Sequence, residues 1–526
     1  MRNLSSRGLL GLLPAILCTV LPAAVSAQEA PPQEPKKPFL EPSEMPEMHV
    51  STKLKAAVEE HPDQRGRWET LPVLMPINPV HVALMRNGKV LVVSGSGNDP
   101  DNKNFQAAVW DPSAHTLKTF TTSWDMFCNG MVVLPDGRPF VLGGTLKYDP
   151  FLGEPRTSAF DPSSEKFVDL AKMSGGRWYP TGTVLGDGSV LVYSGLNDTK
   201  SEINRTVQIW KGTAWTAAGT AFASVELYPR EHLLPNGKVF ESGWNRDSQL
   251  YDPAAHAFTK VADTRFPRDR VYGTSVLLPL TPANGFKPKV MILGGGVPST
   301  NTTELIDLSV PSPKWADGPP MAKARIQLNA TLLPNGRVLV SGGSEKDEDN
   351  ATAVKEAQLY DPESNTFAAA GSMEYPRLYH SNTLLLPDAR VLALGGNPQR
   401  KVYQPEMEIY SPPYLFKADG SPARRPAITS VSGATIAYGA PFQVRTPDAA
   451  KIKSAVLIRP GAVTHSFDME QRLVGLSFTA GSGVLNVKAP ANGNLAPPGY
   501  YLLFILNSDG VPSLGRFVRL VPASRR

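Results

Sequence analysis

The stretch Ala330-Thr-Leu-Leu-Pro-Asn-Gly-Arg-Val-Leu-Val-Ser-Gly-Gly343 places a turn between two short apolar runs. Asn-Gly at such a turn is a strong hairpin signal, because both residues of the favoured two-residue loop adopt positive φ angles. Related turns recur along the chain, with the glycine or its counterpart at residues 88, 137, 188, 237, 285, 336 and 389. Successive turn positions are separated by 49, 51, 49, 48, 51 and 53 residues, which indicates a repeat of nearly constant length.

Each repeat contains more than one hairpin. A second turn cue follows several of the first ones, as in Tyr251-Asp-Pro253 and Tyr360-Asp-Pro362. A four-stranded unit of about 50 residues is typical of kelch-type propellers. Seven copies predict an all-β, seven-bladed kelch-type β-propeller over residues 66–424. The last copy ends at Ile409-Tyr-Ser-Pro-Pro413 without an outer strand. Arg67-Trp-Glu-Thr-Leu71 resembles that strand, so we expect it to complete the seventh blade and remove an exposed edge.

The sequence changes character after the seventh repeat. We expect residues 425–526 to form a separate, immunoglobulin-like β-sandwich of about 100 residues. Three stretches there have the pattern of strands: Ser454-Ala-Val-Leu-Ile-Arg459, the alternating Leu485, Val487 and Ala489, and Tyr500-Tyr-Leu-Leu-Phe-Ile505.

The composition fits a β-rich globular protein and excludes several other classes. Gly and Pro account for 44 and 50 of the 526 residues, more than long helical bundles or coiled coils tolerate. The 53 Lys and Arg residues are nearly balanced by 48 Asp and Glu residues, which argues against a dedicated nucleic-acid surface. A hydrophobic content of 41% excludes wholesale disorder.

The N-terminal segment has the pattern of an export signal. Arg2 and Arg7 provide a positive start, a mostly apolar run follows, and Val25-Ser-Ala27 is a small-residue cleavage site. We therefore expect residues 1–27 to be a signal peptide and the protein to be secreted or periplasmic, with no stable membrane span. A retained membrane anchor is the alternative. Residues 28–65 are rich in Pro, Glu and Lys and predict an extended linker.

Removal of the signal leaves Cys128 as the only cysteine, which cannot form an internal disulfide. Such a cysteine is either a small buried hydrophobe or a residue with a chemical task. Its place in the repeat leaves both readings open. Counting seven residues back from the turn proline, or from Gly186 where that proline is replaced, gives one equivalent position in six repeats: Cys128, Tyr179, Tyr228, Tyr272, Gln327 and His380.

Equivalent positions in a propeller lie on a ring, here near one end of the strands closest to the central axis. Residues scattered over about 250 positions would thus converge on the mouth of one channel. Thiol, phenol and imidazole groups on such a ring suit metal or redox chemistry. A wet channel lined by polar side chains without chemistry is the alternative.

Four segments of the chain resemble the copper radical oxidases typified by galactose oxidase and glyoxal oxidase. The resemblance extends over residues 66–526. The segments are Phe127-Cys-Asn-Gly130, Arg177-Trp-Tyr-Pro180, Leu378-Tyr-His-Ser381 and Val463-Thr-His-Ser466.

The resemblance implies a site with one copper ion and an organic radical. Tyr179, Tyr379, His380 and His465 would bind the copper, with Tyr179 equatorial and Tyr379 axial. The sulfur of Cys128 would be bonded to a ring carbon of Tyr179, and this thioether-linked tyrosine would hold the radical. Two imidazoles, phenolates and a solvent position in a tetragonal arrangement suit Cu(II).

The chemistry of such a site needs both the copper ion and the radical. Oxidation of an alcohol or aldehyde removes two electrons, whereas Cu(II) accepts only one, so a second one-electron acceptor must lie beside the metal. Tyr379 would accept the substrate hydroxyl proton as general base, the Tyr179 radical would take a carbon-bound hydrogen atom, and O2 would leave as H2O2. The resemblance, together with the export signal, thus implies an exported copper-dependent oxidase of a small aldehyde, a primary alcohol or a carbohydrate terminus.

Two geometric conditions apply to this site. Tyr379 and His380 are neighbours, and neighbouring side chains of a regular strand point to opposite faces. Both can therefore reach one metal only where the strand is irregular. His465 belongs to the predicted C-terminal domain, so its loop must enter the channel.

Other residues are candidates for substrate contacts. Tyr228 and Tyr272 lie on the ring, and Arg230 and Arg177 are close to it in sequence. Aromatic and arginine side chains at the mouth suit a sugar or a small aldehyde hydrate. The Arg-Trp-Tyr-Pro segment resembles glyoxal oxidases, which favours glyoxal or methylglyoxal, and Arg230→Ala is then expected to raise KM for glyoxal.

One tryptophan of the resembled family has no direct counterpart. Galactose oxidase stacks a tryptophan over the cross-linked tyrosine from the loop after that tyrosine's own turn, and the corresponding residues 195–198 contain none. Trp244 is the candidate to replace it, and Trp178 is expected to pack between blades.

Two other functions fit the predicted fold. A non-catalytic kelch propeller that binds glycans or protein partners would have no need of Cys128. A metal-dependent hydrolase or lyase would need acid–base carboxylates at the axis, and the aligned ring contains none. We expect a monomer whose partners are its substrate and O2. Six histidines match no ligand segment and are expected to be surface or structural residues: His49, His61, His81, His115, His232 and His256.

Overall fold

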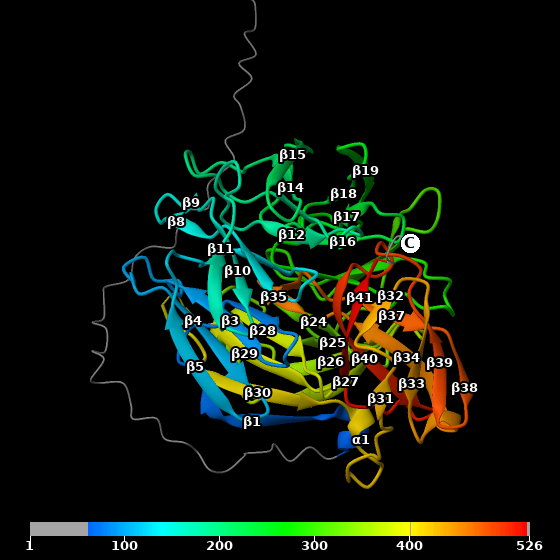
Figure 1. The fold of residues 1–526 in the computed structure, drawn as a ribbon. Helices are drawn as coiled ribbons and strands as arrows, with labels where there is room; N and C mark the ends of the chain where they lie inside the picture. Colours follow the sequence, from blue (N-terminus) through cyan, green and yellow to red (C-terminus); the bar gives the residue numbers. More distant parts are fainter. Residues whose placement is uncertain (1–60, 400, 523–526) are drawn as a thin grey trace, which may run out of the picture. The chain divides into compact units, whose positions relative to one another are not determined.

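The computed structural model describes residues 61–399 and 401–522, whose regular secondary structure is almost entirely β-strand (Figure 1). The predicted signal peptide and residues 28–60 of the predicted linker lie outside the described residues. The end of that linker forms the short helix α1 (Pro62–Arg65), which contacts the 3-10 turn η2 (Pro413–Leu415). Within the described part of the chain, no helix has the length and apolar character needed to cross a membrane.

The repeated turn is a three-residue hairpin loop in six of the seven copies, so the expected two-residue loop was wrong. The copy at Gly285 has a longer connection, closed by the amide of Leu278 and the carbonyl of Lys289. In the first copy the amide of Gly88 donates to Met85 O and the amide of Met85 donates to Lys89 O, both at 2.9 Å. Of the turn residues only the glycine has a positive φ, +82°, which is a type I turn followed by a left-handed bulge residue. In the repeats with a Leu-Pro turn, the proline excludes the expected loop, and the first repeat has the same turn with Arg86 in that position. Pro334 of the quoted stretch fixes φ near −65°, which fits the first central residue of a type I turn and forbids a positive angle there.

Seven antiparallel sheets follow one another between residues 67 and 411, each built around four strands in a meander. The hairpin β8 (Thr145–Lys147) and β9 (Leu152–Gly153) is inserted in the second of them. From the first strand outward, the sheets are β2 (His81–Leu84), β3 (Val90–Gly95), β4 (Gln106–Asp111) and β5 (Thr116–Thr121); β6 (Gly130–Val133), β7 (Pro139–Leu142), β10 (Thr157–Asp161) and β11 (Lys166–Asp169); β12 (Thr181–Val184), β13 (Val190–Tyr193), β14 (Thr206–Trp210) and β15 (Trp215–Thr220); β16 (Glu231–Leu233), β17 (Val239–Glu241), β18 (Asp247–Asp252) and β19 (Ala257–Asp263); β20 (Thr274–Leu277), β21 (Lys289–Leu293), β22 (Thr303–Asp307) and β23 (Trp315–Asp317); β24 (Asn329–Leu332), β25 (Val338–Ser341), β26 (Glu356–Asp361) and β27 (Thr366–Ser372); and β28 (Tyr379–Leu385), β29 (Val391–Asn397), β30 (Glu406–Ser411) and β1 (Arg67–Leu74).

The first strands of these sheets are neighbours in a cyclic order. Strand β6 contacts β2 and β12, β12 contacts β16, β24 contacts β20 and β28, and β28 contacts β2. The remaining pair, β16 and β20, is joined by His232 and Ser275, whose Nε2 and Oγ atoms are 2.7 Å apart. Every first strand thus has a first strand on either side.

The N-terminal strand completes the last sheet, as the sequence predicts. Strand β1 pairs antiparallel with β30, with Arg67 opposite Ser411 and Trp68 opposite Tyr410 (Figure 1). The Trp68 ring is buried 4.9 Å from the Tyr410 ring, and its indole N–H donates to Gly371 O at 2.9 Å. Pairing of the two chain segments leaves β30 with no free edge.

The C-terminal residues form two further sheets that share one apolar core, which is a two-layer β-sandwich. Val444 and Leu485 contribute to that core from one sheet, and Leu457 and Leu503 from the other. The first sheet contains β31 (Ser430–Val431), β33 (Pro441–Arg445), β39 (Val484–Lys488) and β38 (Phe478–Gly481). The second contains β32 (Thr435–Ala437), β41 (Arg516–Val521), β40 (Gly499–Asn507), β34 (Ile452–Ile458) and β37 (Leu473–Leu476), with the turn η3 (Ala449–Lys451) before β34.

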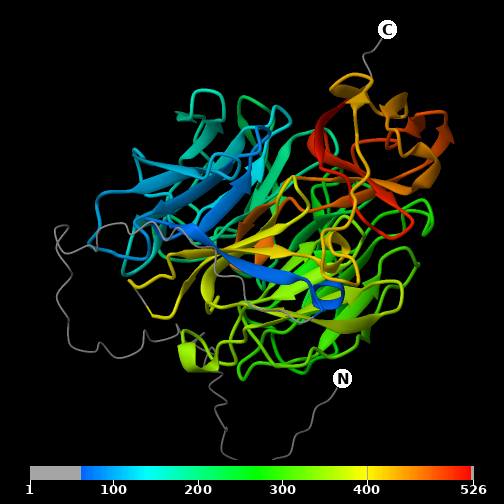
Figure 2. The same ribbon diagram turned by 90° about the horizontal axis from the view of Figure 1, so that it is seen from below.

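A hairpin connects the C-terminal sheets to the first strands of the repeats. Strand β35 (Ala462–Thr464) pairs antiparallel with β2, with Val463 opposite Val82, and β36 (Phe467–Asp468) returns beside it (Figure 2). The chain beyond the hairpin is held by other sheets. The Gln471 side chain donates to Ala330 O at 2.8 Å, and the amide of Leu280 donates to Leu473 O at 3.0 Å. The β35–β36 hairpin is therefore fixed among the repeats.

One buried ion pair ties this connection together. The Arg459 guanidinium binds the Glu470 carboxylate, Val133 O at 2.9 Å and Pro497 O at 3.1 Å, and both charged side chains are at most 4% exposed. Arg459→Met leaves Glu470 unpaired in the interior, so we expect the free energy of unfolding to fall by about 3–5 kcal/mol. Denaturant titration measures this loss. The control is Arg424→Met, which breaks an exposed pair and should cost less than about 1 kcal/mol. Equal losses in both variants would contradict the prediction.

Candidate functional site

The six equivalent positions that precede the repeated turns share one backbone conformation. Non-glycine residues rarely adopt positive φ angles, so the recurrence marks a common local bend. The bend lies immediately before each first strand, or at the start of it in β28, and takes the side chain out of the regular strand alternation. The residues are Cys128 (φ +60°), Tyr179 (+69°), Tyr228 (+48°), Tyr272 (+59°), Gln327 (+59°) and His380 (+62°).

Backbone hydrogen bonds join several of these positions across neighbouring sheets. The amide of Tyr179 donates to Cys128 O at 3.0 Å, and the amide of Tyr228 donates to Tyr179 O at 2.8 Å. The amide of Gln327 likewise donates to Tyr272 O at 2.8 Å. Residues far apart in the sequence are thereby held in one layer.

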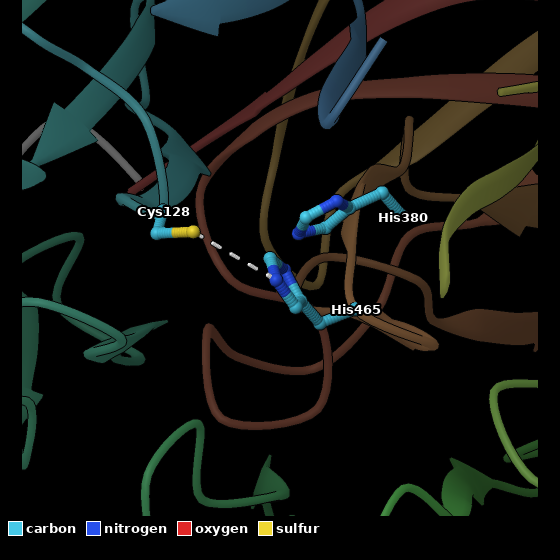
Figure 3. A group of neighbouring side chains, drawn as sticks. All are labelled: Cys128, His380 and His465. Carbon is cyan, nitrogen blue, oxygen red and sulfur yellow. Dashed lines mark hydrogen bonds between the residues drawn. The ribbon is translucent and has the colours of Figure 1, made fainter. Parts of the chain in front are cut away.

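Five of the predicted site residues come together in this layer. One donor atom from each of Cys128, His380 and His465 lies within 4.8 Å of the other two (Figure 3). The His465 Nε2 atom is 2.9 Å from the Tyr179 hydroxyl and 3.9 Å from the Cys128 sulfur. The Tyr179 and Tyr379 hydroxyls contact each other. Only Tyr379 of the five is partly exposed, so solvent reaches the group from its side.

The strand is irregular at Tyr379 and His380, as the prediction requires. Tyr379 pairs with Asn397 and Ser381 pairs with Gly395, while His380 between them has φ +62°. The Tyr379 and His380 rings consequently lie on the same side, with centroids 3.9 Å apart. A regular strand would have separated them.

Neighbouring oxygen atoms fix the tautomers of both histidines. His380 Nδ1 is 2.5 Å from Asn397 Oδ1, and the amide nitrogen of Asn397 donates to Val402 O, so its oxygen must accept the Nδ1 proton. The His380 Nε2 atom then carries a lone pair, and it has no hydrogen-bond partner among the described residues. The arrangement is that of a metal-ligating histidine with an oriented ring.

A neighbouring oxygen atom also fixes the tautomer of His465, which lies at the tip of the β35–β36 hairpin. His465 and Ser466, with φ of +46° and +66°, form the turn. The Thr464 hydroxyl donates to Val80 O at 2.9 Å and lies 2.6 Å from His465 Nδ1, so it accepts the Nδ1 proton. The hairpin thus brings the His465 Nε2 lone pair into the layer, as the sequence requires of a ligand from the C-terminal part.

Burial keeps the donor groups uncharged in the absence of a cation. It lowers the pKa of His380 to about 3 and the pKa of His465 well below its usual value. It also raises the pKa values of the Cys128 thiol and of the Tyr179 and Tyr379 phenols well above their usual range. Neutral imidazoles are ready to bind a metal, and a bound cation would stabilise the phenolates that burial disfavours. Two imidazoles and two phenols form a donor set that fits copper(II).

The ring stacked on Tyr179 belongs to Trp178, so the expectation that Trp244 takes this place was wrong. The Trp178 and Tyr179 centroids are 3.7 Å apart at 13°, and Phe151 stacks on the other side of the indole at 4.3 Å. Trp244 instead contacts Tyr272 edge-on at 5.6 Å. The left-handed bend at Tyr179 accounts for the difference, because it brings two consecutive side chains to the same side.

Tyr228 and Tyr272 have different positions relative to the five clustered site residues. The buried Tyr228 ring lies 4.4 Å from Tyr179 and 4.6 Å from His465, and its hydroxyl donates to Asn129 O at 2.7 Å. It supports the site and has no free surface for substrate. Tyr272 is half-buried and meets the Tyr379 ring edge-on at 5.9 Å, beside the exposed side of the group.

The two arginines are not substrate contacts, which corrects the prediction for Arg230 and its KM effect. Arg230 is 1% exposed and donates to the carbonyl oxygens of Tyr228, Gly273 and His465 at 2.7–3.3 Å. Its role is to hold the backbone of His465. Carbonyl groups left free by the bends attract these guanidinium groups into the interior. Arg177 is also buried and donates to the carbonyl oxygens of Ser194, Asn204 and Thr206.

His81 is the buried histidine that sequence reasoning did not connect with the site. It is fully buried 6.0 Å from the His465 ring, and neither of its nitrogens has a hydrogen-bond partner among the described residues. Its place in the repeat was the available signal, because Pro79 occupies the ring position of the first repeat and His81 follows two residues later. The other histidines divide between the exposed His61, His115 and His256 and the buried His232, while His49 lies outside the described residues.

Comparisons with known proteins agree over nearly the whole described chain. Residues 102–414 match the family model for the N-terminal region of glyoxal oxidase, and residues 425–520 match the galactose oxidase-like early set domain. The chain is 28% identical to the galactose oxidase of Gibberella zeae over 86% of this chain and 70% of that protein. It is also 28% identical to the aldehyde oxidase GLOX of Vitis pseudoreticulata, over 89% and 100% respectively.

A solved structure shows the same fold. A fungal alcohol oxidase of the AA5 family, in complex with copper, superposes with a TM-score of 0.77 at 26% identity. The match covers 87% of this chain and 99% of that one. The glyoxal oxidase model alone spans more than half of the sequence. The chain therefore belongs to the glyoxal oxidase and galactose oxidase family of copper radical oxidases.

Proposed function

We propose that this copper-dependent oxidase is exported and converts a small aldehyde or a primary alcohol, including the terminus of a carbohydrate, while O2 is reduced to H2O2. The observation that carries the proposal is the convergence of Cys128, Tyr179, Tyr379, His380 and His465 in one buried layer. Both histidines there present an unprotonated Nε2 atom. The names of the relatives, a galactose oxidase and an aldehyde oxidase, support these two substrate classes.

The proposed architecture is a seven-bladed propeller over residues 66–424 with an immunoglobulin-like domain over 425–526. The cyclic contacts between first strands and the pairing of β1 with β30 support the propeller. Residues 1–27 are proposed to be the signal peptide that directs export.

In the proposed site, His380 Nε2, His465 Nε2 and the oxygens of Tyr179 and Tyr379 hold one copper ion. Copper(II), when bound, accepts one of the two electrons that oxidation of the substrate releases. Tyr179 carries the thioether to Cys128, because a sulfur substituent makes the ring easier to oxidise. Trp178 covers the Tyr179 ring and excludes water from it.

Substrate is proposed to approach from the Tyr379 side, since this residue alone of the five is partly exposed. Tyr379 then takes the hydroxyl proton of an alcohol or an aldehyde hydrate as general base. The oxidised Tyr179 takes the hydrogen atom from the adjacent carbon. The two residues therefore accept the O–H proton and the C–H hydrogen of one bound substrate.

Copper-loaded mature protein should release one H2O2 for each substrate molecule oxidised, with oxygen consumed in the same amount. Glyoxal, methylglyoxal, galactose and simple primary alcohols form the substrate panel. Tyr179→Phe should abolish the reaction. Tyr438→Phe should retain it, because Tyr438 follows strand β32 and its hydroxyl donates a hydrogen bond to Ala496 O. Absence of peroxide with every substrate, together with unchanged glycan or protein binding in Cys128→Ser, would favour a binding propeller instead.

A further inference from the structure

We propose that Asp347 gives the entrance of the site a fixed negative charge that selects neutral, hydroxyl-bearing substrates over anionic ones. The inference deepens the proposed oxidase function and rests on it. Asp347 lies in the exposed connection between β25 and β26, and nothing in the aligned repeats marks it as a site residue.

The carboxylate reaches from the surface to the ring of equivalent positions. Gln327 occupies one of those positions and is only 2% exposed. Its Nε2 atom nevertheless donates a hydrogen bond to Asp347 Oδ1, although Asp347 itself is exposed. The acid therefore stands at the border between solvent and the buried layer.

Asp347 is also close enough to affect the residues through which substrate enters. The backbone amide of Gln327 donates a hydrogen bond to Tyr272 O, and the Tyr272 ring contacts the Tyr379 ring. The negative charge thus acts on the partly exposed side of the proposed copper site.

Two polar groups near this entrance can accept hydrogen bonds, the Asp347 carboxylate and the side-chain oxygen of Gln327. None of the described ion pairs includes Asp347, and Gln327 Oε1 is buried without a described partner. The guanidinium groups of Arg230 and Arg177 are directed to backbone carbonyls. A carboxylate and a carboxamide oxygen suit the hydroxyl groups of a polyol or an aldehyde hydrate, whereas they repel the carboxylate of a molecule such as glyoxylate.

The matched variants for a test are Asp347→Asn and Glu345→Gln. Both remove one negative charge from the same loop, and Glu345 is exposed. Azide is a suitable probe, because it is an anion at neutral pH and its binding to Cu(II) is followed by the charge-transfer absorption without any turnover. We expect the azide dissociation constant to fall by about threefold to tenfold in Asp347→Asn and by less than about twofold in Glu345→Gln, with the difference shrinking at high salt.

Kinetics supply a second readout. The ratio of kcat/KM for glyoxylate to that for neutral glyoxal should rise in Asp347→Asn and stay constant in Glu345→Gln. Equal azide affinities in the two variants would refute the role of Asp347 while leaving the oxidase intact. Absence of an azide band in every variant would instead refute the copper site on which the inference rests.

Discussion

Cys128→Ser is expected to fold and bind copper but to lose oxidase activity by about 10³-fold, which corresponds to about 4 kcal/mol of activation free energy. The serine hydroxyl fits the space of the buried thiol and cannot replace it chemically. Without sulfur on its ring, Tyr179 is harder to oxidise, so the second electron acceptor is lost. Both proposed histidine ligands remain, which is why copper binding should persist.

Intact mass measures the covalent half of this prediction. Wild-type protein incubated with copper and oxygen should lose the mass of two hydrogen atoms and its free thiol, because a bond forms between the Cys128 sulfur and a Tyr179 ring carbon. Metal-free wild type is the control and should keep both. A peptide map with unmodified Cys128 after aerobic copper loading would contradict the mechanism, as would Cys128→Ser with more than half of the wild-type turnover.

His465→Ala is expected to weaken copper binding by at least about 100-fold, since even residues that only orient metal ligands contribute about 10- to 100-fold. The variant removes the Nε2 atom that the β35–β36 hairpin brings to the layer. Neighbouring residues of the hairpin keep their contacts, because Thr464 still donates to Val80 O. Turnover should fall with the affinity at limiting copper.

Isothermal titration with copper measures the affinity directly, and the thermal midpoint of the metal-free protein checks folding. His256→Ala is the matched control, because His256 is exposed in a hairpin turn outside the site. If His465→Ala bound copper as tightly as His256→Ala, the C-terminal residues would serve the structure alone.

The repeat made most of the architecture predictable. A turn every 48–53 residues fixed the hairpins, and the similarity of Arg67–Leu71 to a missing strand correctly predicted its pairing with β30. The form of the turn was not predicted, because Asn-Gly was given more weight than the preceding proline. Pro334 alone excludes a positive φ at its own position.

The candidate site was predictable where equivalent positions could be counted, and not where side-chain direction decided the outcome. Cys128, Tyr179 and His380 were found by their distance from the turn. The sequence did not identify Trp178 as the residue that stacks on Tyr179, because neighbouring side chains of a regular strand point to opposite faces. The left-handed φ of Tyr179, which places both rings on one side, cannot be predicted from a single sequence. Arg230 was predicted to lie at the channel mouth, whereas backbone carbonyl groups hold it in the interior. Nothing in the sequence marks these carbonyl groups as binding partners.

The position of His465 at the tip of the β35–β36 hairpin has a consequence for how the proposed site is assembled. Three of the proposed ligands belong to residues 179–380, whereas the fourth, His465, lies 85 residues beyond the last of them. Residues 1–424 alone lack this hairpin, so they could not complete the proposed metal site. With the proposed ligand set, a complete copper site needs both the repeats and the folded β35–β36 hairpin.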